Sequence, residues 1–261
     1  LLSWNCLYIK GMIKLYKITQ EEKYLNAIDR ALNFICQNMI EDNLIYSCFN
    51  DKACFPGYLD DYAMFASALI DYLTINWNNK YFEVCRKLCF HLINDFEDKK
   101  RGGYYFTSNN HEKLFYRPKS ISDDSVPSGL IYATDVLLQM GYLSGEQEFI
   151  DSAYRSISYI NRSFGDNITS NVSAINLLKD NNLEREIIIV RTNDKNWKKI
   201  IKEKSYYQKY IVFINKDETN LPSSIAMKKP NKSFAAYICK GMTCSKPILS
   251  LDKLVDFIND K

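Results

Sequence analysis

Apolar residues recur at helical spacing through the first 164 residues of the chain. A face that repeats every three to four residues is typical of an amphipathic helix. The first such stripe consists of Trp4, Leu7, Tyr8, Gly11, Met12, Leu15 and Tyr16, and a second runs over residues 24–35. Two helices joined by so short a turn must pack as an antiparallel hairpin.

The same pair of stripes recurs twice further along the chain. One pair covers residues 59–73 and 81–96, and the other covers residues 127–138 and 149–160. We expect Pro127 to be the first residue of its helix, a position that proline favours. Thr19 and Ser144 are each followed three residues later by Glu or Gln, which predicts capping boxes at two helix starts. The sequence therefore predicts at least three helical hairpins.

The turns within these hairpins are short, whereas the connections between them, residues 41–58 and 97–126, are long. In a curved or closed array of hairpins, such connections lie at one end, which then carries the variable chemistry. Residues 102–107 and 114–116 predict a β-hairpin projecting at that end. Three hairpins also leave open edges, where we expect exposed apolar surface.

After residue 164 the period of the pattern changes. Residues 186–191, 210–214 and 235–239 are β-type runs, and residues 172–178, 196–204 and 251–258 have a helical pattern. The predicted fold is therefore mainly α: a partial α/α toroid over residues 1–164, followed by a C-terminal tail with a small α/β subdomain over residues 165–261.

Composition excludes several classes of function. The 261 residues are 46% hydrophobic and 25% charged, as in an ordinary soluble globular protein, and the formal net charge of +3 indicates no nucleic-acid partner. The sequence contains no apolar run long enough to cross a membrane, and a soluble, cytoplasmic protein is favoured. A helical pattern is already running at Trp4, so we expect that preceding sequence is missing.

The eight cysteines sit mostly inside helical or strand patterns, so reduced, packed thiols are expected. Cys85 and Cys89 share one apolar helix face and are interpreted as core. Cys239 and Cys244 bracket a Gly-containing turn and could form a disulfide or half a metal site. Since no further ligand pair follows, we expect neither a metal nor another cofactor.

Polar residues gather at or just before the predicted helix starts on the loop-rich end, and they should converge. Asp61 and Asp123 could act as acid and base on a sugar, with Arg117 orienting one of them. The residues expected to bind the substrate are Trp4, Asn5, Asp60, Tyr62 and Ser128. The alternative is that acids at helix starts only cap free N–H groups, and for Asp60 and Asp124 the two interpretations carry equal weight.

Histidine chemistry is less well supported. Only His91 and His111 are present, and both are interpreted as surface residues. A Ser-His-Asp triad through Ser128 is not supported either, since the chain has no G-x-S-x-G motif and no well-placed histidine.

Several motifs occur together in a recognisable order. They are Trp4-Asn5, Leu59-Asp60-Asp61-Tyr62-Ala63, Gly102-Gly103-Tyr104-Tyr105, Arg117-Pro118-Lys119, Asp123, Pro127-Ser128-Gly129, Ala236-Tyr237-Ile238-Cys239 and Cys244-Ser245-Lys246-Pro247. In this order they resemble the C-terminal half of the thioredoxin-domain-containing DUF255 family, the relatives of spermatogenesis-associated protein 20. The resemblance spans nearly the whole chain.

The resemblance implies an upstream thioredoxin-like domain in the same chain and a toroid similar to six-hairpin glycosidases and N-acylglucosamine 2-epimerases. A sugar or another small molecule is then the expected ligand. Cys6 stands where the family usually has Gly. Leu130 stands where the family often has Asn, so a polar group is lost at the expected pocket, which puts any family-typical activity in doubt. The alternative is a non-catalytic binding or scaffold module that serves the upstream redox domain.

Overall fold

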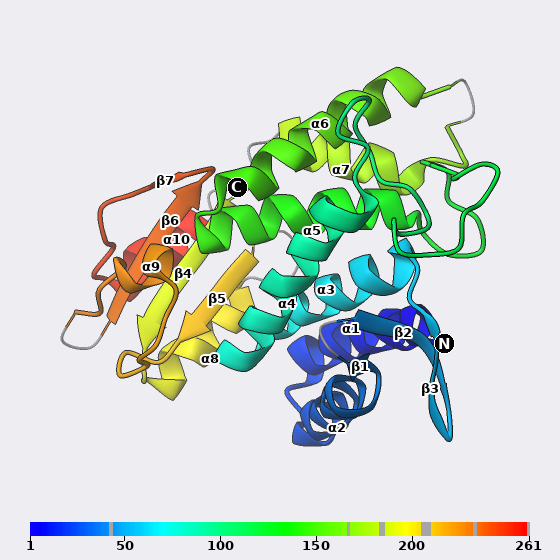
Figure 1. The fold of residues 1–261 in the computed structure, drawn as a ribbon. Helices are drawn as coiled ribbons and strands as arrows, with labels where there is room; N and C mark the ends of the chain where they lie inside the picture. Colours follow the sequence, from blue (N-terminus) through cyan, green and yellow to red (C-terminus); the bar gives the residue numbers. More distant parts are fainter. Residues whose placement is uncertain (42–43, 166–167, 183–185, 205–209, 232–233, 260–261) are drawn as a thin grey trace.

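The computed structural model describes residues 1–41, 44–165, 168–182, 186–204, 210–231 and 234–259. Three helical hairpins make up its larger part: α1 (Leu2–Thr19) with α2 (Glu22–Asn38), α3 (Leu59–Leu73) with α4 (Asn79–His91), and α5 (Gly129–Ser144) with α6 (Gln147–Ser163). Helix α3 lies between α1 and α5 and packs on both (Figure 1). The predicted mainly α architecture is confirmed.

The inner and outer helices differ in sequence for a physical reason. Almost every side chain of α3 is buried, because this helix is covered by α1, α4 and α5. Helices α2 and α6, in contrast, bury one stripe and leave a polar face in water. The first layer of helices, α1, α3 and α5, is thus backed by a second layer, α2, α4 and α6.

The two predicted capping boxes are wrong. Helix α2 has Glu21 as its N-cap, and α6 has Glu146. Thr19 and Ser144 instead end the preceding helices, and their hydroxyls accept the N–H groups of Glu21 at 3.3 Å and Glu146 at 3.3 Å. The turns are so tight that both residues still belong to the helix before the turn and cannot cap the helix after it. Pro127 likewise precedes α5, whose N-cap is Ser128.

The long connections contain structure that the sequence pattern did not predict. Residues between α2 and α3 form an antiparallel sheet of β1 (Ile40–Glu41), β2 (Leu44–Asn50) and β3 (Lys52–Pro56). Cys48 lies opposite Cys54 in this sheet, with their Sγ atoms 2.9 Å apart. After α4, the chain continues as a single π-helical turn, η1 (Leu92–Phe96).

The β-hairpin predicted over residues 102–116 is wrong. The described chain there has one isolated bridge, between Glu97 and Tyr104. Gly102 and Gly103 adopt φ angles of 79° and 76°, which strands do not use. Asp98 organises the loop instead, because its carboxylate accepts from Lys119 at 2.8 Å and from the Tyr105 hydroxyl at 2.9 Å. This ion pair holds the pKa of Asp98 at about 2 despite burial.

The C-terminal part comprises α7 (Val172–Asn182), β4 (Glu186–Thr192), α8 (Lys195–Lys204), β5 (Tyr210–Ile214), α9 (Ser223–Ala226), β6 (Phe234–Lys240), β7 (Thr243–Cys244) and α10 (Leu251–Asn259). The sheet order is β5-β4-β6-β7, with β4 and β5 parallel. The predicted strands and helices are confirmed to within a few residues. Of the two alternatives for Cys239 and Cys244, the disulfide is present, across the β6–β7 hairpin.

The sheet divides its side chains between two cores. Ile187 and Ile189 join the core of the helical hairpins, whereas Ile188 and Val190 face a second core that includes Leu254 of α10. In Figure 1 the sheet lies at the left, at the opposite end of the helices from β2, β3 and the N-terminus. In the described part of the chain, no helix is both long and apolar enough to cross a membrane.

Candidate functional site

The first residues of α1, α3 and α5 lie at the same end of the hairpins as the β1–β3 sheet and the loop before α5 (Figure 1). The residues predicted to form a site come from this end. The charges of Asp61 and Asp124 both act on Asp60, so these three carboxylates lie near one another, and their surroundings differ.

Asp61 is the third residue of α3 and is 3% exposed. Its Oδ2 accepts the Tyr58 N–H at 3.0 Å, and its Oδ1 accepts the Ser3 N–H of α1 at 3.1 Å. Burial raises the pKa of Asp61, although these N–H donors and the Ser47 hydroxyl oppose the rise. Asp61 therefore ties the starts of α1 and α3 together.

Asp60, the second residue of α3, points instead toward α5. Its Oδ1 lies against Gly129, where a Cβ atom would come within 1.9 Å of the oxygen. Burial, then the charges of Asp61 and Asp124, raise the pKa of Asp60 from 3.8 to about 6. A carboxyl with this pKa is partly protonated near neutral pH, as a general acid requires.

Asp123 accepts N–H groups from two elements. Its Oδ1 takes the Ser128 N–H at 3.0 Å and its Oδ2 takes the Ser173 N–H at 2.8 Å, at the starts of α5 and α7. The Ser128 hydroxyl donates to the Ser120 carbonyl at 3.0 Å. Asp124, in contrast, is exposed. Asp123 and Ser128 thus fix the loop that carries Asp124 toward Asp60.

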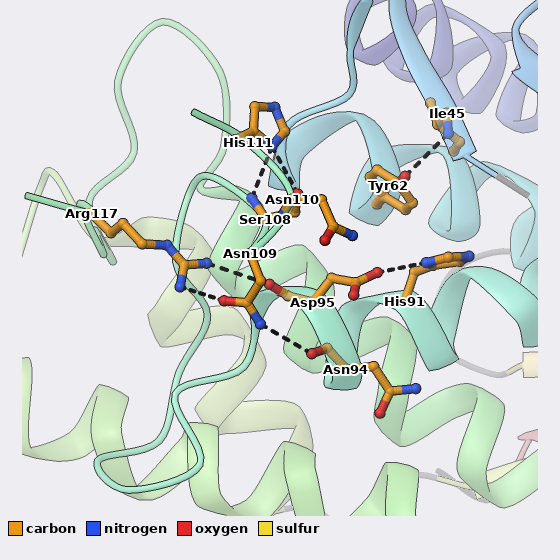
Figure 2. Close-up of polar contacts among 10 residues, drawn as sticks. All are labelled: Ile45, Tyr62, His91, Asn94, Asp95, Ser108, Asn109, Asn110, His111 and Arg117. Carbon is orange, nitrogen blue, oxygen red and sulfur yellow. Dashed lines mark hydrogen bonds and ion pairs between the residues drawn. The ribbon is translucent and has the colours of Figure 1, made fainter. Parts of the chain in front are cut away.

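Arg117 belongs to a different group of contacts. Its guanidinium donates to the Asn109 Oδ1 at 2.7 Å and to the carbonyls of Asp95 and Thr107, and it lies 4.2 Å over the Tyr105 ring. Figure 2 shows Arg117 reaching Asn109 beside η1. These contacts hold the loop before α5 on the π-helical turn.

The remaining predicted residues, Trp4, Asn5 and Tyr62, differ in exposure and in contacts. Trp4 is 61% exposed on α1. The Asn5 side chain, also exposed, donates to the Leu1 carbonyl at 2.6 Å. Tyr62 is 4% exposed, and its hydroxyl accepts the Ile45 N–H at 3.1 Å, which anchors β2 on α3.

Sequence reasoning missed a polar pair beside Tyr62. His91 Nδ1 lies 2.7 Å from Asp95 Oδ2, and the His91 ring lies 5.7 Å from that of Tyr62 (Figure 2). Both side chains of the pair are less than a quarter exposed, so His91 is not the surface residue that was predicted. The four-residue spacing of His91 and Asp95 was the available signal. His111 is also partly buried; its Nδ1 accepts the Ser108 N–H at 3.2 Å, and its ring lies tilted against that of Tyr58, with the centroids 5.0 Å apart.

A second group of polar residues lies between the inner helices. Lys10 of α1 donates to Asp71 and Ser67 of α3, both at 2.6 Å, and lies over the Tyr132 ring of α5. Burial lowers the pKa of Lys10, but the charges of Asp71, Tyr132 and Asp135 and the hydrogen bond to Asp71 together outweigh it, so the pKa is raised. An aspartate inside the apolar run of residues 59–73 was the signal for this pair. In the described residues, no group of three potential ligands is placed to hold a metal ion.

Helical hairpins with an inner and an outer layer, and carboxylates gathered where the inner helices begin, define a protein of the α/α-toroid class. The chain belongs to Glycosyl Hydrolase Family 88, whose family model matches residues 3–172. The Caenorhabditis elegans protein B0495.5 is 24% identical over 283 residues, a match that covers 98% of this chain and 37% of the relative. The chain thus spans little more than a third of that relative's length.

Solved structures of the same class resemble the fold. A GH76 α-mannanase of Bacteroides thetaiotaomicron superposes with a TM-score of 0.53 and 12% identity, covering 69% of this chain and 51% of the mannanase. Cellobiose 2-epimerase from Bacillus thermoamylovorans gives a TM-score of 0.50 and 12% identity, covering 62% of this chain and 44% of the epimerase. At such identities, the likeness concerns the fold alone.

Proposed function

We propose that this chain is a sugar-directed part of a toroid enzyme, glycosidase-like or epimerase-like, in which Asp60 is the general acid. The observation that carries the proposal is the raised pKa of about 6 at Asp60, a carboxyl beside two others at the end where the inner helices begin. A protonated carboxyl donates a proton to the oxygen that leaves a sugar, and a neighbouring carboxylate assists as base or nucleophile.

The neighbours of Asp60 support this role. Asp124 is exposed and close enough for its charge to raise the pKa of Asp60. Asp61 and Asp123 are engaged by main-chain N–H groups, so in this proposal they hold the helix starts and keep Asp60 and Asp124 together. Trp4, which is exposed on α1, supplies aromatic surface at the same end, where a sugar ring could stack.

We further propose that the chain is the C-terminal portion of a longer protein with an upstream thioredoxin-like domain. The resemblance of its motifs to the thioredoxin-domain-containing DUF255 family supports this arrangement, as does the match to about a third of a longer relative. A C-x-x-C motif in the sequence preceding Leu1 is the feature expected in that domain.

The test is a pH profile of the longest natural form of the protein against a panel of disaccharides, whose alkoxide leaving groups require protonation. Protonated Asp60 is the active form, so kcat/KM should fall as the pH rises above about 6. Asp60→Asn should lower kcat/KM by about 10²–10⁴-fold and remove this alkaline limb, while far-UV circular dichroism stays unchanged.

Asp252→Asn, at an exposed position of α10, is the charge-matched control and should leave the profile intact. Turnover at the wild-type rate in Asp60→Asn contradicts the assigned role. Absence of both sugar turnover and calorimetric sugar binding in the wild type contradicts the sugar-directed function and favours the alternative, a non-catalytic module serving the redox domain.

A further inference from the structure

The carboxyl ends of the parallel strands β4 and β5 border a hollow of about 340 Å³. Its lining includes Arg191 near the end of β4 and Lys216, Glu218, Thr219 and Asn220 after β5. In open α/β sheets, ligands bind outside the carboxyl ends of the strands. The hollow lies outside residues 3–172, the part that matches the glycosyl hydrolase family.

Arg191 is a charged residue in a buried position near the end of strand β4. It is 3% exposed, and it alternates with Ile187 and Ile189, which places it on the side of the sheet that faces the helical hairpins. Three of its N–H groups donate to main-chain carbonyls, those of Lys228, Asn215 and Lys216, at 3.0–3.3 Å. A guanidinium has five N–H donors, and the Nε of Arg191 is buried without a partner.

The charge of Arg191 is not balanced by an ion pair in the described part of the chain. A buried cation whose contacts are carbonyl oxygens pays for its desolvation without a counter-ion. Accordingly, burial lowers the pKa of Arg191, and Tyr237, Glu218 and Asp217 offset the change only in part.

The nearby carboxylates have partners of their own. Glu218 Oε1 accepts from the Asn79 side chain of α4 at 2.9 Å, and Asp217 accepts from Asn193 at 2.5 Å. Lys216 adds a second cation to the lining. Among the charged residues of the lining, two are cations and one is a carboxylate, so an added negative charge is favoured.

We propose that this hollow binds a small molecule through a phosphate or carboxylate group, with Arg191 and Lys216 as its cationic ligands. Both groups carry anionic oxygens that pair well with a guanidinium. The volume is at the lower end of the range for small-ligand sites, which suits a compact ligand. Strands β4 and β5, which border the hollow, lie at the opposite end of the helices from the N-terminus and the β2–β3 hairpin, so the proposal is independent of the proposed sugar chemistry (Figure 1).

Calorimetric titration of the whole chain with two probes, inorganic phosphate and acetate, in chloride buffer at fixed ionic strength, tests this site. Wild type should give saturable heat with at least one probe, and the tighter probe identifies the preferred oxyanion. Lys216→Gln should weaken that binding at least tenfold. Its main-chain N–H, which donates to Asn193, is unchanged, so the fold should be kept.

Lys253→Gln on α10 removes the same charge from an exposed position and is the control, which should bind as wild type does. Saturable binding that Lys216→Gln loses and Lys253→Gln keeps supports the site. No saturable heat with either probe, or equal affinity in Lys216→Gln and wild type, overturns it. Replacing Arg191 would leave the three main-chain carbonyls that it contacts without their donor and could destabilise the fold. Lys216 is therefore the residue to replace in this test.

Discussion

Four aspartates lie near helix starts at one end of this molecule: Asp60, Asp61, Asp123 and Asp124. The position of each residue relative to its helix start decides which groups its carboxylate can contact. The third residue of a helix can reach back to the N-cap main chain, which is where the Asp61 carboxylate accepts the Tyr58 N–H. The second residue cannot do so, and Asp60 packs against α5 instead. Burial raises the pKa of both carboxyls, but the two adjacent aspartates differ in role because Asp61 accepts main-chain N–H groups whereas Asp60 lies against α5 beside other carboxylates.

The contact between Asp60 and Gly129 provides a prediction at this scale. A Cβ on residue 129 would lie 1.9 Å from Asp60 Oδ1 and 3.1 Å from its Cα, so Gly129→Ala must move the carboxylate or separate α3 from α5. We expect a loss of about 1–3 kcal/mol in the free energy of unfolding, measured by denaturant melts.

Gly129→Ala should also disturb sugar turnover, since Asp60 is displaced. The double variant Gly129→Ala with Asp60→Ala is the control, because the shortened side chain leaves room for the new methyl group. It should lose less stability than the two single changes together, and strict additivity would show that the contact is not the cause.

At the scale of elements, α1 differs from the other inner helices. Helix α3 is covered on both sides by neighbours, whereas α1 packs on α2 and α3 and leaves a stripe of apolar residues in water. Its exposed fractions are 61% for Trp4, 70% for Tyr8, 36% for Leu15 and 55% for Ile18. This stripe is the open edge that three hairpins were predicted to leave.

Gly11 lies in the middle of the exposed stripe, and a Cβ there meets nothing within 4 Å. In the 261-residue chain, Gly11→Ala should therefore raise the free energy of unfolding by about 0.5–1 kcal/mol, because alanine loses less backbone freedom in a helix. Gly141→Ala should instead lower the free energy of unfolding, because its Cβ would lie 2.6 Å from the Ile150 side chain. A destabilising Gly11→Ala would show that this face is covered in solution.

At the scale of the whole molecule, the helical hairpins and the C-terminal sheet share one core. Ile187, Ile189 and Val212 of the sheet belong to the same buried cluster as the helices. Polar contacts join the two parts as well: Asn79 of α4 donates to Glu218, and Ser224 donates to the Leu143 carbonyl at 2.6 Å. The boundary at residue 165, proposed from the change in period, is thus crossed by a continuous apolar interface.

The three tryptophans allow a direct test of this coupling. Trp77 packs on Phe82 in the α3–α4 hairpin, and Trp197 packs on Phe234 in the second core. In a Trp4→Phe background, proteins that retain only Trp77 or only Trp197 should give the same denaturant midpoint by fluorescence, because one core unfolds cooperatively. Midpoints that differ by more than the fitting error, with the Trp197 signal lost first, would identify two independently folding domains.

The sequence by itself determined the helical hairpins, the strands of the tail and the set of acids at the helix starts. These features follow from local periodicity and from composition, which the chain carries without its tertiary context. The tertiary structure decided which acid accepts main-chain N–H groups and which lies against α5, that Arg117 contacts η1, and that Arg191 is buried beside a hollow. Those outcomes depend on contacts between residues far apart in sequence: Asp60 with Gly129, Asp61 with Ser3, and Asn79 with Glu218. The burial and partners that set a pKa exist only once these segments pack.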